Sequence, residues 1–388
     1  MPPANEILPP PLSLYVHLPW CVRKCPYCDF NSHKAADDTP FERYVLALAH
    51  DLAREANEAG DRPVTSIFLG GGTPSLFRPA HIRIILDSCR RLLNLAADCE
   101  ITMEANPGTV EHGSLAAYRD AGVTRLSVGA QSFHLQSLQA LGRIHGPEQI
   151  EMTFREAASA GFDSINLDLM FALPGQSPAL AAADIGRLLE LSPPHVSYYQ
   201  LTLEPNTVFF SRPPAAMPDE DTAWEIQAHG HHLLGQAGYE QYEISAFARP
   251  GHRCRHNLNY WQFGDYLAVG AGAHGKLTTA DGTVLRYQKP ANPLQYIEQA
   301  EGNGQALVRM PVDIKDMAFE FMLNVLRLSD GFSAELLKAR AGLEPSAIRA
   351  ELDQATADGL LDALPGQKWR PTNTGFRFLN DLQARFLP

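Results

Sequence analysis

Three cysteines within eight residues are the side chains of this sequence best suited to chemistry. Cys21, Cys25 and Cys28 follow a strand-like run with the spacing C-x3-C-x2-C. A closed zinc site usually has four ligands in two pairs, and the sequence offers no second cysteine pair, although His17 or His33 could add a ligand. An iron–sulfur cluster normally takes four cysteines. Three cysteines would therefore leave one iron open to an exogenous ligand.

The other three cysteines carry weaker signals. Six cysteines in 388 residues are too few for a disulfide scaffold, which favours a reducing compartment. Cys89 and Cys99 lie in patterns typical of core positions, and no chemistry is assigned to them. Cys254 lies two residues before His256 and is a second soft ligand candidate in that segment.

Composition and charge exclude several classes of protein. Hydrophobic residues make up 45% and charged residues 20%, as in ordinary globular proteins. The net charge of −12 disfavours binding to nucleic acid along a broad face. No apolar run approaches 18 residues, and the opening MPPANEILPPPLS lacks the basic and apolar parts of a signal peptide. We therefore expect a cytoplasmic protein without a membrane span.

The first 240 residues alternate strand-like runs with helical patterns, which predicts βα units on a parallel sheet. Six units without a dinucleotide fingerprint favour a barrel over a doubly wound sheet. The expected strands are Leu12–Leu18, Ser66–Leu69, Glu100–Ala105, Arg125–Gly129, Ser164–Met170 and Val196–Thr202. The expected helices are Phe41–Ala59, His81–Asn94, Glu148–Ala160, Ala179–Leu191 and Asp219–Ala237.

Polar or glycine-rich segments follow several of these strands. In a βα barrel the carboxyl ends of the strands form the active site, so these segments are the expected site. They are Gly70–Pro74, Glu104–Pro107, Gln131, Asp168 and Glu204–Asn206.

The pattern changes after residue 238 and again after residue 305. We expect a barrel core over 1–238, an aromatic-rich extension over 239–305 that ends in a linker at Asn292–Gln305, and a winged-helix-like part over 306–388. The expected elements of the last part are helices Asp313–Arg327, Ser333–Ala341 and Pro345–Asp358, a two-stranded wing in Leu360–Pro371 and a helix from Thr374.

The segment CVRKCPYC, with Tyr27 directly before the last cysteine, resembles the signature of the radical-SAM superfamily. The resemblance implies an α/β fold, a partial (β/α)6 barrel with an α+β extension and a C-terminal winged-helix-like domain. It also implies a [4Fe–4S] cluster on the three cysteines. S-adenosyl-L-methionine (SAM) would chelate the open iron through its amino and carboxylate groups.

Further positions match this superfamily residue by residue. Glycines let a backbone approach a ligand closely, and an arginine can clamp a carboxylate with two hydrogen bonds. Ordinary capping or ion-pair roles remain the alternative for each position taken singly. The resemblance implies SAM contacts at Tyr15, Tyr27, Gly70, Gly71, Gly72, Thr73, Glu104, Gln131, Arg143 and Asp168. His274, in GAGAHG, could also face the SAM pocket.

Over nearly its whole length the chain resembles the oxygen-independent coproporphyrinogen III oxidase-like group. The true oxidases carry a further cysteine two positions after the third, where this chain has Phe30, and a longer arm than the 20 residues before Cys21. The segment His256–Trp261, HNLNYW, resembles the HNxxYW hallmark of HemW-type heme chaperones. That resemblance implies heme contacts at His256, Asn257, Tyr260 and Trp261, and transfer of heme to acceptors such as respiratory enzyme subunits.

Elementary chemistry agrees with a heme site, because histidine can ligate heme iron and aromatic rings suit a flat macrocycle. A satisfied core histidine is the alternative for His256. A heme chaperone is therefore the expected function, and a radical-SAM oxidase of coproporphyrinogen III is the runner-up. A DNA-binding regulator is disfavoured, because residues 311–388 hold 9 basic and 11 acidic side chains. SAM cleavage, transient membrane association and a monomer or dimer are left open.

Overall fold

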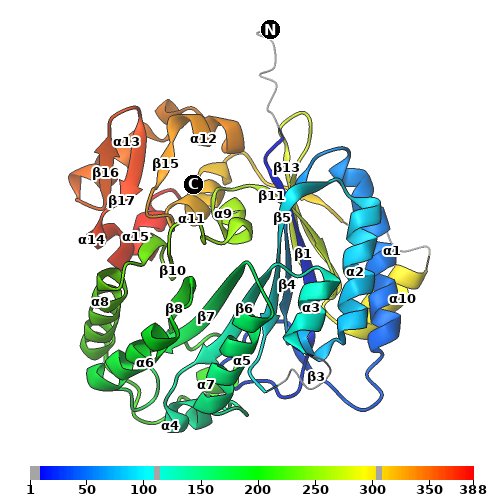
Figure 1. Ribbon diagram of the computed structural model, residues 1–388. Helices are drawn as coiled ribbons and strands as arrows, with labels where there is room; N and C mark the ends of the chain where they lie inside the picture. Colours follow the sequence, from blue (N-terminus) through cyan, green and yellow to red (C-terminus); the bar gives the residue numbers. More distant parts are fainter. Residues whose placement is uncertain (1–8, 109–113, 303–307) are drawn as a thin grey trace.

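A single curved sheet organises the computed structural model, which describes residues 9–108, 114–302 and 308–388 (Figure 1). Over these residues the sheet has twelve strands in the order β14-β13-β12-β11-β1-β4-β5-β6-β7-β8-β10-β9. The run from β11 to β8 is parallel, and the strands beyond it at both edges are antiparallel.

The parallel strands are β11 (Asp265–Val269), β1 (Leu12–Leu18), β4 (Val64–Gly71), β5 (Leu95–Ala105), β6 (Arg125–Gln131), β7 (Ser164–Phe171) and β8 (His195–Gln200). The antiparallel strands are β12 (His274–Thr278), β13 (Val284–Gln288) and β14 (Met310–Pro311) at one edge, and β10 (Ala246–Ala248) and β9 (Glu240–Glu243) at the other.

The alternation of side chains along each strand gives the sheet an outer face and an inner face. Leu14, Val16 and Leu69 lie on its outer face and are fully buried under helices. Successive side chains of a strand point to opposite faces, so the intervening positions face inward. The covering helices are α1 (Phe41–Ala59), α2 (Pro79–Leu92), α3 (Leu115–Ala121), α5 (Pro147–Ser159), α6 (Pro178–Leu191), α8 (Glu220–Gln236) and α10 (Pro293–Glu301).

The inner face of the sheet is polar, and we call the space that it surrounds the lumen. Tyr15, Glu104, Asp168, Ser197 and Tyr199 face it and are only half-buried, whereas the outer face is fully covered. The carboxyl ends of the parallel strands point downward in Figure 1, toward β3 (His33–Lys34), η1 (Pro74–Leu76), α4 (Leu135–Ala140) and α7 (Val208–Ser211). The short helix α9 (Arg255–Trp261) lies at the opposite end.

The C-terminal part has a core of its own. Its elements are α11 (Met317–Val325), α12 (Ala334–Ala341), η2 (Pro345–Ile348), α13 (Arg349–Ala357), α14 (Asn373–Arg377), α15 (Leu379–Ala384) and the small sheet β15 (Phe332–Ser333), β17 (Lys368–Pro371) and β16 (Leu361–Leu364). Phe263 and Val284, from the main sheet region, belong to the same apolar cluster as Phe321 and Trp369. The two parts are therefore packed together through that core.

The six expected barrel strands and five expected helices are confirmed, within a few residues at their ends. The expected linker at Asn292–Gln305 is wrong over its described residues, because α10 packs Tyr296, Ile297 and Ala300 into the main core. Residues 303–307 lie outside the described residues.

The division of the chain at residues 238 and 305 stays a prediction, although strands from both sides of residue 238 share one sheet. Over the described residues no helix combines the length and apolar character needed to span a bilayer.

Candidate functional site

The cysteine loop lies at the carboxyl end of β1. Cys21 ends the two-residue strand β2 (Trp20–Cys21), and the Cys28 amide donates to the Cys25 carbonyl at 3.1 Å. All three thiols are free. Burial raises the pKa of Cys21 to about 11, and burial also raises the pKa of Cys28. A bound metal centre would supply the positive charge that favours the thiolate form of these side chains.

The three thiols of the loop are donors of the type that iron–sulfur clusters take. Over the described residues no group of three or more His, Cys, Asp or Glu side chains is gathered closely enough to hold one metal ion. A tetrahedral zinc site needs such a group. In an iron–sulfur cluster each thiolate binds a different iron, so wider spacing is required. Three free thiols in one loop are the donor set that a [4Fe–4S] cluster with one open iron would take.

Asn31 fastens the cysteine loop to the far edge of the sheet. Its Nδ2 donates to the carbonyls of Ala271 at 2.9 Å and Ala291 at 2.8 Å. The Asn31 carbonyl in turn lies 2.9 Å from His17 Nε2. On the other side, the amide of Phe209 on α7 donates to the Pro26 carbonyl at 3.0 Å. Segments distant in sequence thus hold the loop in place.

The glycine segment Gly70–Thr73 leaves β4 directly beside this loop. The Gly72 amide donates to the Leu18 carbonyl and the Thr73 amide donates to the Trp20 carbonyl, both at 2.8 Å. A Cβ on Gly72 would lie 2.7 Å from the Trp20 oxygen, so only glycine fits there. Close approach of two backbone segments explains the glycines before any ligand is considered.

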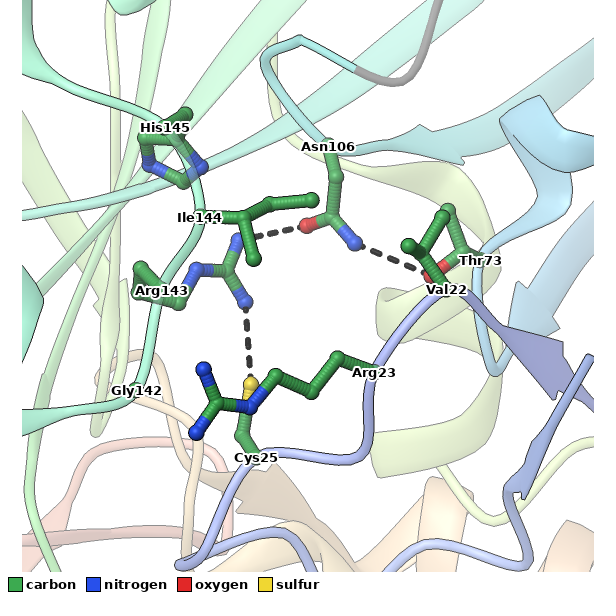
Figure 2. Close-up of a pocket in the computed structure, with 9 residues that line it drawn as sticks. All are labelled: Val22, Arg23, Cys25, Thr73, Asn106, Gly142, Arg143, Ile144 and His145. Atoms are coloured by element: carbon green, nitrogen blue, oxygen red, sulfur yellow. Dashed lines mark hydrogen bonds between the residues drawn. The ribbon is translucent and has the colours of Figure 1, made fainter.

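Arg143 points at the cysteine loop, as Figure 2 shows. Its Nη1 lies 3.6 Å from Cys25 Sγ, and its Nη2 donates to the Gly129 carbonyl at 2.9 Å and to Asn106 Oδ1. Asn106 also donates to Thr73 Oγ1 at 3.0 Å. These residues line a pocket of about 320 Å³, partly open to solvent, with Val22, Arg23, Gly142, Ile144 and His145. A cationic group fixed beside the thiols could bind a carboxylate in this pocket.

Two carboxyl groups face the lumen close to the pocket. The Gly71 amide donates to Glu104 Oε2 at 3.0 Å. Burial and the nearby charge of Asp168 raise the pKa of Glu104 to about 7. Asp168 lies inside β7, which continues to Phe171. Its carboxyl accepts from Asn166 Nδ2 at 2.7 Å and from Ser127 Oγ at 3.3 Å.

Three more expected SAM residues surround these carboxyl groups. Gln131 ends β6 with a φ of +68°, a left-handed conformation that is uncommon for a residue with a side chain. Its Oε1 accepts from the Tyr199 hydroxyl at 2.7 Å. The Tyr15 hydroxyl lies 3.0 Å from His17 Nδ1, and the ring centroid of Tyr27 lies 6.3 Å from that of Phe209. Strained backbone at Gln131 aims its side chain across the lumen.

The HNxxYW segment forms α9 at the opposite end of the lumen. Glu100 on β5 accepts from the Arg255 amide at 3.0 Å and the His256 amide at 3.3 Å, and thereby caps the helix. Its Oε1 also lies 3.6 Å from Cys254 Sγ. His256 Nδ1 lies 3.2 Å from Ser66 Oγ. α9 therefore bonds to both β4 and β5.

His256 is buried against aromatic rings of the lumen. Its ring centroid lies 5.1 Å from that of Phe68 and 6.5 Å from that of Tyr15. Burial and then the charge of Arg125 lower the pKa of His256 to about 3. The imidazole is therefore neutral at physiological pH, which is the form that ligates iron.

Of the remaining residues of the motif, Trp261 contacts the C-terminal part. The rings of Tyr260 and Trp261 meet edge to face at 4.7 Å, and the Arg327 guanidinium lies 4.2 Å over the Trp261 ring. Asn257 is half-buried on α9. His274 is exposed at the start of β12, and its pKa is lowered by partial burial and by Arg286.

The structure gathers the cysteines, glycines, Glu104, Gln131, Arg143 and Asp168 at the carboxyl half of the lumen and places the HNxxYW segment at its other end. Two residues of this site were not predicted from the sequence. Asn106 joins Arg143 to Thr73, and Arg125 is buried in the lumen. The alternation of strand residues would have placed Arg125 on the same face as Ser127, since the two positions are two residues apart.

Two family models match the chain. The Radical SAM superfamily model matches residues 15–183, and the HemN C-terminal domain model matches residues 312–378. The first match covers the cysteine loop and the strands from β4 to β7, and the second covers most of the C-terminal part.

Curated relatives and a solved structure resemble the chain over nearly its full length. It is 48% identical to "Heme chaperone HemW" of Escherichia coli, over 97% of this chain and 98% of the relative. It is 45% identical to "Heme chaperone HemW" of Haemophilus influenzae, over 97% and 98%. The solved coproporphyrinogen III oxidase (HemN) of Escherichia coli, a radical SAM enzyme, matches with a TM-score of 0.82 and 25% identity, over 99% of this chain and 91% of that one.

Proposed function

Because the chain belongs to the heme chaperone HemW family, we propose that it binds heme and passes it to acceptor proteins. The observation that carries this proposal is the 48% identity to a heme chaperone across 97% of the chain. The HNxxYW segment lies within the matched length and is complete in this sequence. Respiratory enzyme subunits are the acceptor class that we propose.

We further propose that Cys21, Cys25 and Cys28 hold a [4Fe–4S] cluster with SAM at its open iron. A bound cluster and SAM supply one-electron chemistry at the SAM sulfonium. The protein contributes binding and orientation. Arg143 offers its guanidinium to the SAM carboxylate, and the backbone of Gly70–Thr73 faces the amino group. Glu104, Gln131 and Asp168 offer acceptors, and Tyr15 and Tyr27 pack around the ligand.

The heme contact that we propose is His256, as iron ligand or as its hydrogen-bonded support. Nδ1 is engaged with Ser66, so Nε2 is the atom available to iron. The neutral state of the buried ring supports ligation. Asn257, Tyr260 and Trp261 complete the contact, with the two aromatic rings packing on the macrocycle. Because α9 is packed into the barrel, heme binding at this residue requires a rearrangement of α9.

Heme titration followed by Soret absorbance tests this proposal. His256→Ala should bind heme weakly or with a changed spectrum, because the iron loses its ligand. A Cys21/Cys25/Cys28→Ala variant should lose the iron–sulfur absorbance and still bind heme, since α9 lies at the other end of the lumen. His252→Ala, which removes a histidine four residues before His256, is the matched control. Unchanged affinity and spectrum in His256→Ala would remove the ligand assignment.

A second candidate function rests on the likeness to the solved coproporphyrinogen III oxidase. We propose that oxidase activity is absent here, because Phe30 occupies the position two residues after the third cysteine. Anaerobic incubation of the reconstituted protein with SAM, reductant and coproporphyrinogen III decides between the two. Efficient turnover would overturn the chaperone proposal.

We infer a cytoplasmic location, supported by three free cysteines in one loop, which an oxidising compartment would tend to cross-link. A monomer or a dimer is compatible with this function, and size-exclusion chromatography with and without heme distinguishes them.

A further inference from the structure

A short chain of hydrogen-bonding side chains holds His256 where α9 meets the sheet. The Asn259 Nδ2 atom lies 2.9 Å from Ser13 Oγ on β1. Ser13 Oγ lies 2.7 Å from Ser66 Oγ on β4, and Ser66 Oγ lies 3.2 Å from His256 Nδ1. All four residues are buried, so each hydrogen in this chain needs an acceptor within the protein.

The amide of Asn259 fixes the direction in which these hydrogen bonds run. Its Nδ2 atom also lies 2.9 Å from the backbone carbonyl of Asp265, a group that only accepts. A flipped amide would place an oxygen against that carbonyl, so the amide nitrogen donates to both Asp265 and Ser13. Over the described residues the partners of the Ser13 hydroxyl are Asn259 and Ser66. Because a hydroxyl carries one hydrogen, Ser13 donates that hydrogen to Ser66.

The same accounting assigns the proton of the His256 ring. Over the described residues the Ser66 hydroxyl has Ser13 and His256 as partners, so its own hydrogen is left for His256 Nδ1. Nδ1 is therefore an acceptor, and the ring carries its proton on Nε2. A proton on Nδ1 would instead leave a hydroxyl hydrogen of Ser13 or Ser66 buried without an acceptor, which is unfavourable.

This arrangement is the reverse of the one found in a metal site that is ready to bind. A histidine that ligates a metal through one ring nitrogen almost always donates a hydrogen bond from the other. In this chain the other nitrogen accepts from Ser66, so Nε2 holds a proton in place of a free lone pair. Ligation of iron through Nε2 requires that proton to leave while Nδ1 gains one, so the number of protons on the ring is unchanged.

We propose that Ser66 is a positioning residue that holds His256 in the tautomer with its proton on Nε2, so that the docked α9 does not ligate heme iron. The inference rests on the heme ligand proposed above. When α9 moves to admit heme, Asn259 and His256 leave Ser13 and Ser66 together, so the constraint on the ring ends in the same movement. Ser66 acts through His256 and does not itself contact heme.

Heteronuclear NMR of the full-length protein, isotopically labelled at its histidines, shows which ring nitrogen carries the proton before heme is added. The wild type should carry it on Nε2, and His256→Ala identifies the signal. In Ser66→Asp the carboxylate accepts and has no hydrogen to give, so the proton should move to Nδ1. Thr65→Val is the matched control, because it removes a neighbouring hydroxyl that donates to the Leu12 carbonyl, and it should keep the wild-type tautomer.

A merely structural role for Ser66 would not move the proton between the two nitrogens. A wild-type proton on Nδ1, or an unchanged tautomer in a folded Ser66→Asp variant, overturns the inference. If Ser66→Asp does not fold, the wild-type tautomer and the heme titration of Ser66→Ala decide.

Heme titration gives the second measurement. Ser66→Ala should bind heme roughly two- to tenfold more tightly, because it loses one hydrogen bond that opposes ligation. Thr65→Val should bind as the wild type does. Unchanged or weaker binding in Ser66→Ala overturns the inference, since a hydroxyl that supported the ligand would lower the affinity when removed. A wild type that binds no heme, or unchanged binding in His256→Ala, would refute the proposed heme ligand itself, whichever tautomer NMR finds.

Discussion

Arg143 is the single side chain whose loss should most weaken SAM binding. Its guanidinium is fixed by Gly129 and Asn106 beside Cys25, so it is oriented before a ligand arrives. Losing a charge-assisted contact costs about 1.5–3 kcal/mol, so Arg143→Ala should bind SAM roughly ten- to a hundredfold more weakly. Isothermal titration calorimetry of the reconstituted variants measures this effect.

Arg23, which lines the same pocket from the exposed side, is the control. Arg23→Ala should lose less than about fivefold, because an exposed charge contributes little. Both variants should retain the cluster, since neither arginine ligates iron. Equal SAM affinity in Arg143→Ala and wild type would contradict the assignment.

Glu104 links lumen electrostatics to the stability of the protein without SAM. Its pKa is raised from 4.5 to about 7, so the folded chain holds a proton that the unfolded chain releases. Stability should therefore fall as pH rises from 4.5 to 7, and the full penalty should be present above 7. Glu104→Gln removes this penalty.

Thermal denaturation from pH 4 to 8.5 checks the sign. The melting temperature of Glu104→Gln, relative to wild type, should rise with pH and level off above pH 7. A difference that is the same at every pH would mean that Glu104 does not hold the proton.

At the scale of elements, the cap of α9 by Glu100 connects the HNxxYW segment to the barrel. Glu100→Ala removes an acceptor from the Arg255 and His256 amides, which should cost about 1–2 kcal/mol of unfolding free energy. Urea denaturation measures the loss. Asp98→Ala, which removes only an exposed ion pair with Arg255, should lower the free energy of unfolding much less than Glu100→Ala. Similar losses for the two variants would show that the cap does not hold the helix.

The elements that the sequence predicted well are those with a strong apolar period. In strands such as Leu12–Leu18, the apolar side chains on the outer face of the sheet are all buried. Their alternating pattern can be recognised in the sequence alone. Helix α10 was missed because polar residues dominate it and only Tyr296, Ile297 and Ala300 make its buried face. The position of α9 was missed because its bonds to Ser66 and Glu100 join residues more than 150 positions apart.

In the candidate site, too, residues with a local sequence signal were predicted and residues positioned by distant contacts were not. The cysteines and glycines were found because their spacing is distinctive within a few residues. Arg125 gives no such local signal, since its importance arises from burial and from neighbours on other strands. The hydrogen bond from Ser127 to Asp168 likewise joins two strands, so local sequence does not reveal it.

At the scale of the whole molecule, a buried ion network fastens the far edge of the sheet to α1. Lys289 Nζ lies 2.7 Å from both Asp51 and Glu55, and the Tyr296 hydroxyl donates to Asp51 at 2.8 Å. Lys289→Met would leave the buried carboxyl groups of Asp51 and Glu55 without their counter-charge. It should therefore lower the free energy of unfolding by about 3–5 kcal/mol. Chemical denaturation measures this loss.

Arg43→Ala is the control, because it removes an exposed contact between α1 and α10. Arg43 and Glu301 also join α1 to α10, but both side chains are largely exposed. Arg43→Ala should lower the free energy of unfolding much less than Lys289→Met, because solvent screens such a pair. A cost for Lys289→Met no greater than that for Arg43→Ala would show that the network contributes little.

The fastening of the cysteine loop by Asn31 has a consequence for biosynthesis. Its carbonyl partners, Ala271 and Ala291, are synthesised 240 and 260 residues after Asn31. At roughly 5–20 residues per second, the thiols spend on the order of 13–50 s on the nascent chain before that clasp can close. The order of synthesis thus provides an interval in which a cluster can be delivered to an open loop.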